Sequence, residues 1–202
     1  RIMRRMDIMV TTLKGGVGKT TTAVHLAGAI HDRSPVMLVD MDYGNPGSLS
    51  WAAHGNLPFP VFDLAEGTKR YDAWKGHVVW DAPASPDRER LVSAVTSTDL
   101  VVVPTTSEAL SLSSLRVFLD LLEAERVTYR VLLTMVPPRP SRRGEQAREV
   151  LEEAGVPVFR SSIRRAVAFQ DAALVGGLVH QETEGMARWF EYEAVAKEIL
   201  DG

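Results

Sequence analysis

The sequence contains no cysteine and no apolar run long enough to span a membrane. Without thiols, the chain cannot form disulfides, a thiolate metal site or a cysteine-held iron–sulfur cluster. A membrane-spanning helix needs about 20 consecutive apolar residues, and the segment from Arg1 to Arg5 also lacks the apolar core of a signal peptide. We therefore expect a cytoplasmic protein that does not insert into membranes.

The remaining composition is that of one globular domain. Of the 202 residues, 45% are hydrophobic and 24% are charged, which provides a sizeable core but leaves little room for a second domain. Short runs that are apolar on both faces alternate with helical patterns, as is typical of a parallel sheet covered on both sides. We predict an α/β fold over residues 1–202: a doubly wound, mostly parallel sheet with helices on both faces.

The apolar runs predict the positions of the individual elements. Strands are expected at residues 8–13, 36–39, 61–62, 78–80, 100–103 and 129–135, with a weaker candidate at 156–159. Helices are expected at about 19–32, 86–97, 111–126, 143–154, 164–175 and 184–200. Ser85 before Pro86, and Ser111, are expected N-caps, and Gly155 is expected to end a helix.

A glycine-rich turn between the first expected strand and the first expected helix provides the strongest chemical signal. Gly15, Gly16 and Gly18 can adopt positive φ angles, which lets successive backbone N–H groups converge on an anion at the positive end of the helix. Lys19 adds a mobile charge for phosphates, and the Thr20 hydroxyl suits Mg²⁺. A turn with incidental lysines is the alternative. The predicted ligand is a Mg-nucleoside triphosphate, bound by Lys14, Gly15, Gly16, Val17, Gly18, Lys19, Thr20 and Thr21.

Two later strands are followed by carboxylates. Asp40 and Asp42 come after the run at 36–39, and Asp81 comes after the run at 78–80. Because ligands bind at the carboxyl ends of the strands in open α/β sheets, we expect these side chains to face the glycine-rich turn. A carboxylate at the position of Asp81 can accept hydrogen bonds from Mg-bound water. For each of the three, an ordinary turn or capping aspartate is the alternative.

The turn itself carries a resemblance to a known family. The general phosphate loop G-x-x-x-x-G-K-[ST] would place glycine where this chain has Leu13. The segment K-G-G-V-G-K-T, which opens with Lys14, instead resembles the deviant Walker A loop of the ParA/MinD family of P-loop ATPases, most of all that of small ParA-type partition ATPases. The segments at 101–104 (V-V-V-P) and 163–165 (I-R-R) are similar to the family's later motifs. The lack of cysteine separates the chain from relatives that hold a metal between subunits.

The resemblance implies an Mg-dependent ATPase that converts ATP and water to ADP and phosphate. Lys14 would reach the nucleotide of a second subunit in an ATP-bound homodimer, and Asp42 would orient the attacking water. The implied catalytic residues are thus Lys14, Lys19 and Asp42, and the implied Mg²⁺ site is Thr20, Asp40 and Asp81. Two departures concern Thr134, where relatives often carry an asparagine that recognises adenine, and residues 43–46, which replace the usual P-Q-G.

Positive charge is concentrated in one segment. Residues 137–165 contain seven arginines and four glutamates, a local charge of +3 in a chain whose net charge is −3. Guanidinium groups suit phosphate oxygens, and contacts of this kind give salt-sensitive, nonspecific binding to DNA. For Arg142 and Arg143 a solvated face is an equally open interpretation. Arg164 and Arg165 match the region through which ParA relatives contact DNA. The predicted DNA-binding residues are Arg142, Arg143, Arg164 and Arg165.

These observations predict a DNA partition ATPase that associates with the nucleoid. Its ATP-bound sandwich dimer would bind double-stranded DNA nonspecifically, and a ParB-like partner would stimulate hydrolysis and release. The alternative is a MinD-like or protein-cluster-positioning ATPase. A MinD-like membrane cycle needs a basic amphipathic C-terminal helix, whereas residues 183–202 carry five acidic and two basic side chains. Trp189, Phe190 and Val195 are therefore expected to pack against the sheet. An amidoligase and a non-hydrolysing nucleotide-gated scaffold are further alternatives.

Overall fold

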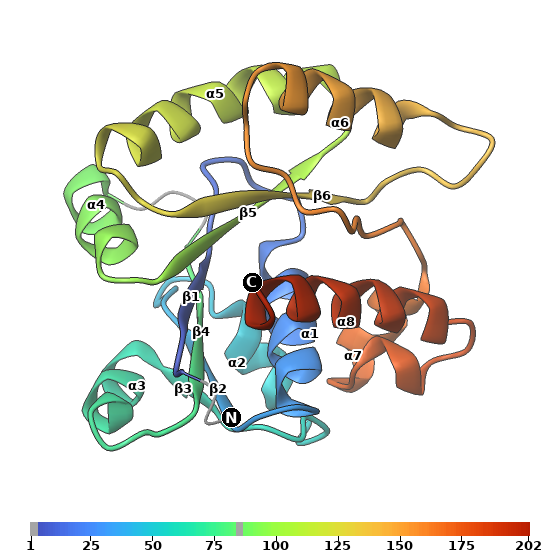
Figure 1. The fold of residues 1–202 in the computed structure, drawn as a ribbon. Coiled ribbons are helices and arrows are strands. Elements are labelled where there is room, and N and C mark those ends of the chain that lie inside the picture. The colour runs from blue at the N-terminus through green and yellow to red at the C-terminus, as the bar shows by residue number, and fades with distance from the viewer. Residues whose placement is uncertain (1–3, 84–86) are drawn as a thin grey trace.

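The computed structural model describes residues 4–83 and 87–202, except for the side chains of residues 109–114. Its sheet has six parallel strands in the order β3-β2-β4-β1-β5-β6 (Figure 1). The strands are β1 (Asp7–Val10), β2 (Val36–Asp40), β3 (Val61–Asp63), β4 (His77–Asp81), β5 (Leu100–Thr106) and β6 (Tyr129–Thr134). The predicted α/β fold with a doubly wound parallel sheet is confirmed.

Helices cover both faces of this sheet (Figure 1). One face is covered by α1 (Lys19–His31), α7 (Ala168–Val175) and α8 (Met186–Leu200), with the short α2 (Gly47–Ala52) and the 3₁₀ helix η1 (Val179–Gln181) beside them. The other face is covered by α3 (Leu64–Tyr71), α4 (Arg88–Thr96), α5 (Ala109–Ala124) and α6 (Arg143–Glu153). Among the helices of the described residues, none is long and apolar enough to cross a membrane.

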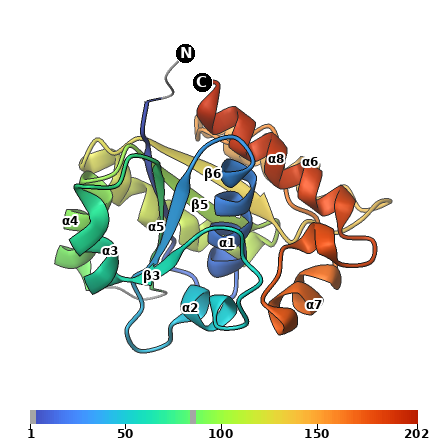
Figure 2. The ribbon, with the colours of Figure 1, turned by 90° about the horizontal axis from the view of Figure 1, so that it is seen from below.

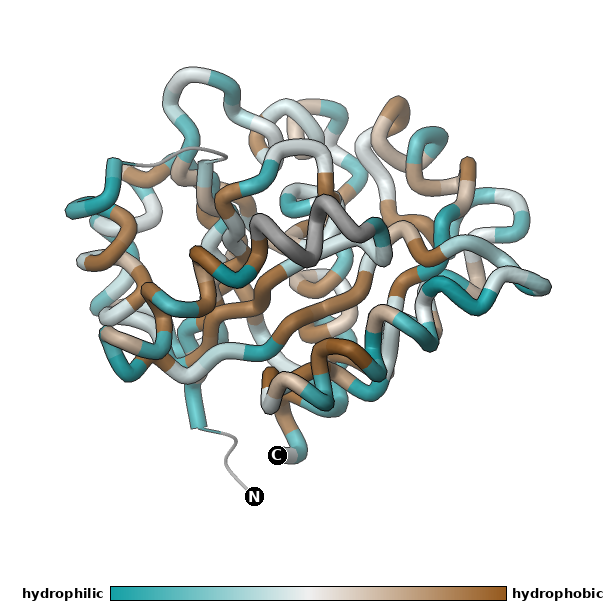
Figure 3. Tube along the Cα trace, turned by 90° about the horizontal axis from the view of Figure 1, so that it is seen from above, coloured by the Kyte–Doolittle hydropathy of each residue, from teal (hydrophilic) through white to brown (hydrophobic). Residues whose placement is uncertain are grey.

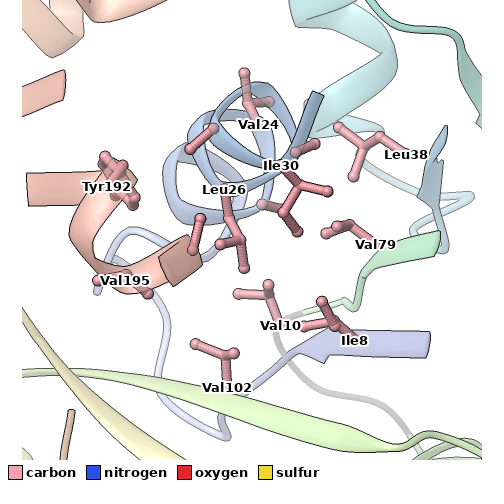
Figure 4. Packing of buried hydrophobic residues seen from close by; sticks show 14 of the residues in the cluster. Ile8, Val10, Val24, Leu26, Ile30, Leu38, Val79, Val102, Tyr192 and Val195 are labelled. Atoms are coloured by element: carbon pink, nitrogen blue, oxygen red, sulfur yellow. The ribbon is translucent and has the colours of Figure 1, made fainter. Parts of the chain in front are cut away.

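The strands contribute side chains to two hydrophobic cores, because successive side chains point to opposite faces of a sheet. Ile8 and Val10 pack toward α1, whereas Met9 between them packs on the other face. Figure 4 shows α1 at the centre of the first core, with Leu26 between strands and the α8 residue Val195. The apolar stretches accordingly lie along the central strands in Figure 3. This packing fixes the start of α1, and with it the glycine-rich turn, above the centre of the sheet.

Several expected boundaries are wrong. The first strand ends at Val10, where the chain turns into the glycine-rich loop. Residues 156–159 form a single bridge, between Val131 and Val158, in place of a strand. The expected helix at 164 begins at Ala168. The sequence did not predict α2 and α3, because both helices are short and contain a glycine.

The expected helix caps had mixed outcomes. Gly155 follows α6 with φ of 73° and confirms the expected end. Ser111 lies inside α5, which begins at Ala109 after Glu108. Ser85 and Pro86 fall outside the described residues, and the side chain of Asp87 caps α4 by accepting the Glu89 N–H.

The C-terminal helix α8 packs against α1. Trp189 and Val195 are buried there, as expected, but the expectation for Phe190 is wrong because 59% of its surface is exposed. Adjacent residues of a helix point about 100° apart, so Phe190 is turned away when Trp189 faces the core. Gly28 of α1 makes the close approach possible, since a Cβ there would lie 3.0 Å from the Trp189 ring.

Candidate nucleotide site

The glycine-rich turn lies at the carboxyl edge of the sheet, between β1 and α1. Gly16 and Gly18 have φ angles of 73° and 84°, in the left-handed region that favours glycine. Gly18 also forms the N-cap of α1, so the helix begins directly at the turn. The predicted order of strand, loop and helix is therefore present, and the N–H groups at the start of α1 face the concave side of the loop.

Lys19 is unusually buried for a lysine, with 8% of its surface exposed. Its Nζ donates a hydrogen bond to the carbonyl oxygen of Lys14 at 3.2 Å, which folds the side chain back over the loop. Burial lowers the pKa of Lys19, and the nearby carboxylates of Asp81 and Asp42 oppose that shift. The structure thus brings Lys19 together with two of the predicted aspartates. An ammonium group in this place can neutralise a bound phosphate.

Asp81, at the end of β4, is 3% exposed and lies beside the hydroxyl groups of Ser48 and Thr20. Ser48 Oγ donates to Asp81 Oδ2, and the Thr20 hydroxyl lies close enough to stabilise the charged carboxylate. Burial raises the pKa of Asp81 to about 6, against the opposing effect of Ser48 and Thr20. Within the described residues, Asp81 Oδ1 is buried without a hydrogen-bond partner. An acceptor of this kind beside a threonine hydroxyl fits a hydrated Mg²⁺ ion.

Asp40, at the end of β2, has both carboxylate oxygens engaged by the following loop. Oδ1 accepts the N–H of Asp42 and Oδ2 accepts the N–H of Leu49, each at 3.0 Å. The buried Asp40 side chain therefore closes the loop between β2 and α2. Direct contact between Asp40 and Mg²⁺ stays a prediction.

Asp42 lies in the loop itself and is partly exposed. Its Oδ1 accepts the N–H groups of Gly44 and Asn45, both at 3.0 Å, which holds the carboxylate in an Asx turn. In the part of the chain that the structure describes, Oδ2 receives no hydrogen bond. The side chain is thus fixed through one oxygen, and the other can accept a hydrogen bond from water.

Thr134, at the end of β6, contacts the phosphate loop. Its buried hydroxyl lies 2.8 Å from the carbonyl oxygen of Val17 and 3.1 Å from that of Thr105. The sequence alone gave no sign of this contact. In this structure, Thr134 supports the loop from β6.

Two of the predicted DNA-binding arginines are paired with carboxylates. Arg142 pairs with Glu145 at 3.0 Å, and Arg164 pairs with Glu191 at 3.3 Å. Arg143 and Arg165 are exposed, and neither has an ion pair among the described residues.

Arg164 lies with three arginines that were not predicted as binding residues. Arg139, Arg148, Arg160 and Arg164 line a small cavity of about 130 Å³ beyond the end of β6. Arg148 donates to the carbonyl oxygens of Phe159 and Arg160, at 2.5 and 3.0 Å, which fixes its guanidinium. Over the residues described, the guanidinium groups of Arg139 and Arg160 have no carboxylate partner. Their membership of the arginine-rich segment was the available sequence signal.

Comparison with known proteins agrees with this geometry. The family model for the CobQ/CobB/MinD/ParA nucleotide-binding domain matches residues 8–179. The chain is 37% identical over 203 residues to the maintenance of carboxysome distribution protein A of Gloeobacter kilaueensis, covering 95% of this chain and 93% of that protein. It is also 30% identical over 188 residues to protein ParA of Rhizobium radiobacter, covering 86% and 84% of the two chains.

Solved structures share the fold at lower identity. A structure described as a plasmid partition protein of Borrelia burgdorferi, bound to AMPPNP, has a TM-score of 0.74 at 17% identity and covers 98% of this chain and 99% of its own. A complex of Cyanothece McdA with ATP has a TM-score of 0.72 at 15% identity and covers 98% and 97%. Both are nucleotide complexes, and their folds extend over nearly the whole of this chain.

Proposed function

We propose that this chain, which belongs to the CobQ/CobB/MinD/ParA family of nucleotide-binding domains, is an ATPase that distributes an intracellular body along DNA. The observation that carries the choice of cargo is the similarity, over almost the full length, to a protein named for the distribution of carboxysomes. This favours the positioning alternative over partition of a DNA cargo. Plasmid or chromosome partition is the second candidate, supported by the similarity to protein ParA.

Hydrolysis follows from charge neutralisation and from the orientation of water. Lys19 lies over the loop, where it would bind the β- and γ-phosphates, and the first N–H groups of α1 would bind the same oxygens. Thr20 and Asp81 would hold Mg²⁺, which supplies positive charge to the phosphate oxygens when bound. Asp42, held in its turn through Oδ1, would orient the attacking water through Oδ2. No covalent intermediate is needed for this chemistry.

ATP would also assemble the dimer. Lys14 directly precedes the glycines of the loop and is partly exposed. If Lys14 contacts the nucleotide of that subunit, binding of ATP and dimerisation become one event, and hydrolysis releases the dimer. A ParB-like partner protein that speeds hydrolysis would then time the release.

The DNA surface would be the exposed arginine-rich region beyond β6 and α6. Arg139 and Arg160 lack ion-pair partners among the described residues, and Arg164 lies with them around one cavity. Arg143 and Arg165 are exposed close by in the sequence. Contacts of this kind involve phosphates and not bases, so binding would be nonspecific and would weaken with salt. The ATP-bound dimer would therefore associate with the nucleoid.

The experiment that tests this function measures binding to random-sequence duplex DNA with ATP, ADP or no nucleotide, at two salt concentrations. We expect binding with ATP only, and a clear loss of affinity at the higher salt concentration. Absence of binding in all three states, in protein that binds ATP, would overturn the role of DNA. Disruption of the gene separates the two cargoes: clumping of an intracellular body supports positioning, whereas loss of a plasmid or chromosome supports partition.

A further inference from the structure

The short helix α2 forms hydrogen bonds with both of the aspartates that are predicted for the metal site, at the ends of β2 and β4. Ser48 Oγ donates to Asp81 Oδ2 at the end of β4, and the Leu49 N–H donates to Asp40 Oδ2 at the end of β2. Ser48 and both carboxylates are buried. The first turn of α2 therefore has a fixed position relative to the carboxyl edge of the sheet.

The same turn lies directly against Thr20. A Cβ at Gly47 would lie 2.7 Å from Thr20 Oγ1, closer than real Cβ contacts. Only glycine lets the backbone approach the hydroxyl that we assign to Mg²⁺. A shift of α2 would consequently alter the surroundings of both Thr20 and Asp81.

The other end of α2 contacts the turn between α7 and η1. Figure 2 shows α2 and α7 as neighbours. Trp51 Nε1 donates to the carbonyl oxygen of Gly177 at 2.9 Å, and Asn56 Nδ2 donates to that of Val175 at 2.6 Å. Gly176, with φ of 67°, lies so close that a Cβ there would be 2.4 Å from the carbonyl oxygen of Trp51. The segment from Val175 to Gly177, which begins the α7–η1 turn, thus supports this end of α2.

A buried histidine of α1 holds the start of η1, at the far end of the α7–η1 turn. His25 Nδ1 lies 2.7 Å from the carbonyl oxygen of Thr21, and its Nε2 accepts the Val179 N–H at 3.1 Å. The His25 ring also meets the Trp51 ring edge-on, with centroids 5.5 Å apart. The α7–η1 turn is therefore linked to α1 independently of α2, which makes it a fixed support for Trp51.

We propose that Ser48 is a positioning residue for Asp81, and that Trp51, through Gly177, holds α2 where Ser48 can act. Ser48 engages Oδ2 and so fixes the rotation of the carboxylate, which leaves Oδ1 for the hydrated metal ion. Binding of Mg²⁺ is thereby coupled to the α7–η1 turn. The proposal rests on the nucleotide site described above and assigns the residues that support its metal.

The first test uses Ser48→Ala and a fluorescent ATP analogue, titrated in EDTA and with increasing Mg²⁺. We expect the Mg²⁺ concentration that gives half of the maximal increase in analogue binding to rise about 10- to 100-fold, as for other residues that orient metal-binding groups. The affinity of Ser48→Ala for the analogue in EDTA should stay at the parental value. Ser93→Ala is a matched change on the exposed side of α4, and it should leave both the affinity in EDTA and the Mg²⁺ requirement at their parental values. A parental Mg²⁺ requirement, or an equal loss of affinity in EDTA, would overturn the role of Ser48. Failure of the parental protein to bind the analogue would instead count against the proposed function.

The second test compares Trp51→Phe with Trp74→Phe. Both substitutions remove an indole N–H that donates to a backbone carbonyl, because Trp74 Nε1 donates to His77 at 3.0 Å on the other side of the sheet. Only Trp51→Phe should raise the Mg²⁺ requirement and speed hydrogen exchange of the Gly177 and Val179 amides. Equal behaviour of the two variants would overturn the coupling. The result for Ser48→Ala decides the case if Trp51→Phe does not fold.

Discussion

The hydroxyl of Thr134 lies 2.8 Å from the carbonyl oxygen of Val17, in the middle of the phosphate loop. This hydrogen bond joins β6, the edge strand of the sheet, to the backbone of the loop that we assign to the nucleotide phosphates. Val17 is itself buried, so its carbonyl oxygen has little access to water. The conformation of the loop is consequently stabilised by the Thr134 side chain of β6 as well as by the glycines of the loop.

Replacement of Thr134 by valine keeps the shape of the side chain and removes the hydroxyl. We expect the free energy of unfolding to fall by about 1–3 kcal/mol, because a buried carbonyl loses its donor, and nucleotide affinity to fall with it. Denaturant unfolding and analogue binding measure the two effects. Thr96→Val is the control, since the Thr96 hydroxyl bonds to the Val92 carbonyl on the exposed side of α4. Equal losses in the two variants would contradict a specific support of the loop.

Asp42→Asn should separate nucleotide binding from hydrolysis. An asparagine oxygen can still accept the N–H groups of Gly44 and Asn45, so the Asx turn is kept while the negative charge is lost. We expect ATP-dependent dimerisation to persist and turnover to fall about 10²- to 10⁴-fold, the usual contribution of a positioned base. Phosphate release and sedimentation measure the two. Hydrolysis at the parental rate would remove Asp42 from the role that we assign to it.

Lys14→Ala should bind ATP as a monomer. The Lys14 carbonyl accepts the hydrogen bond from Lys19, and this contact involves only the backbone, so the substitution leaves it in place. Sedimentation velocity with ATP and Mg²⁺ should show a dimer for the parental protein and a monomer for the variant. A variant that dimerises normally would show that Lys14 does not reach across the interface.

The sequence predicted the sheet, the phosphate loop and the carboxylates at the strand ends because each rests on a local pattern. The strand from Val36 to Asp40 is an apolar run that ends in an acid, and both the strand and the position of its aspartate can be predicted from adjacent residues. The same holds for Lys19, which stands directly after Gly18 at the start of α1.

The residues that the sequence did not reveal act through contacts between distant segments. Ser48 meets Asp81 across 33 positions, and Thr134 meets Val17 across 117. Serine and threonine have no distinctive pattern in these places, and α2 is too short for helical periodicity to show. The arginines illustrate the same limit, because the pairing of Arg142 with Glu145 depends on how the surface is folded.

Acid should destabilise the protein through His25. Burial lowers the pKa of His25 to about 4, below the usual value of 6.5, so the folded state binds fewer protons than the unfolded state. The stability that depends on the neutral ring is thus complete above pH 6.5 and is lost as the pH falls from 6.5 through 4. A shift of this size corresponds to about 3 kcal/mol. Denaturant unfolding of the parental protein between pH 7 and 4 measures it.

His25→Gln should remove most of this acid sensitivity, because glutamine does not titrate and retains both a donor and an acceptor. His54→Gln, at an exposed position, is the control and should keep the parental slope of stability against pH. Parental acid sensitivity in His25→Gln would mean that other groups are responsible.

Charge reversal within the arginine-rich region should separate binding residues from structural ones. Arg139→Glu and Arg160→Glu should each weaken ATP-dependent DNA binding, because neither guanidinium is neutralised by a carboxylate in the described part of the chain. Each lost phosphate contact should reduce the slope of log affinity against log salt by about 1. Arg142→Glu should have a smaller effect, since its charge is already paired with Glu145.

Arg33→Glu is the matched control, because Arg33 pairs with Asp201 at 3.7 Å, far from that region in the sequence. Fluorescence anisotropy of a labelled random-sequence duplex, with ATP and at several salt concentrations, measures all four variants. Nucleotide binding should be unchanged in each of them. If Arg139→Glu and Arg160→Glu match Arg33→Glu in affinity and in salt slope, DNA binds elsewhere, and the cavity beyond β6 is a solvated part of the surface. If Arg142→Glu has the largest effect, the N-terminal end of α6 carries the contact, and the ion pair between Arg142 and Glu145 must open when DNA binds.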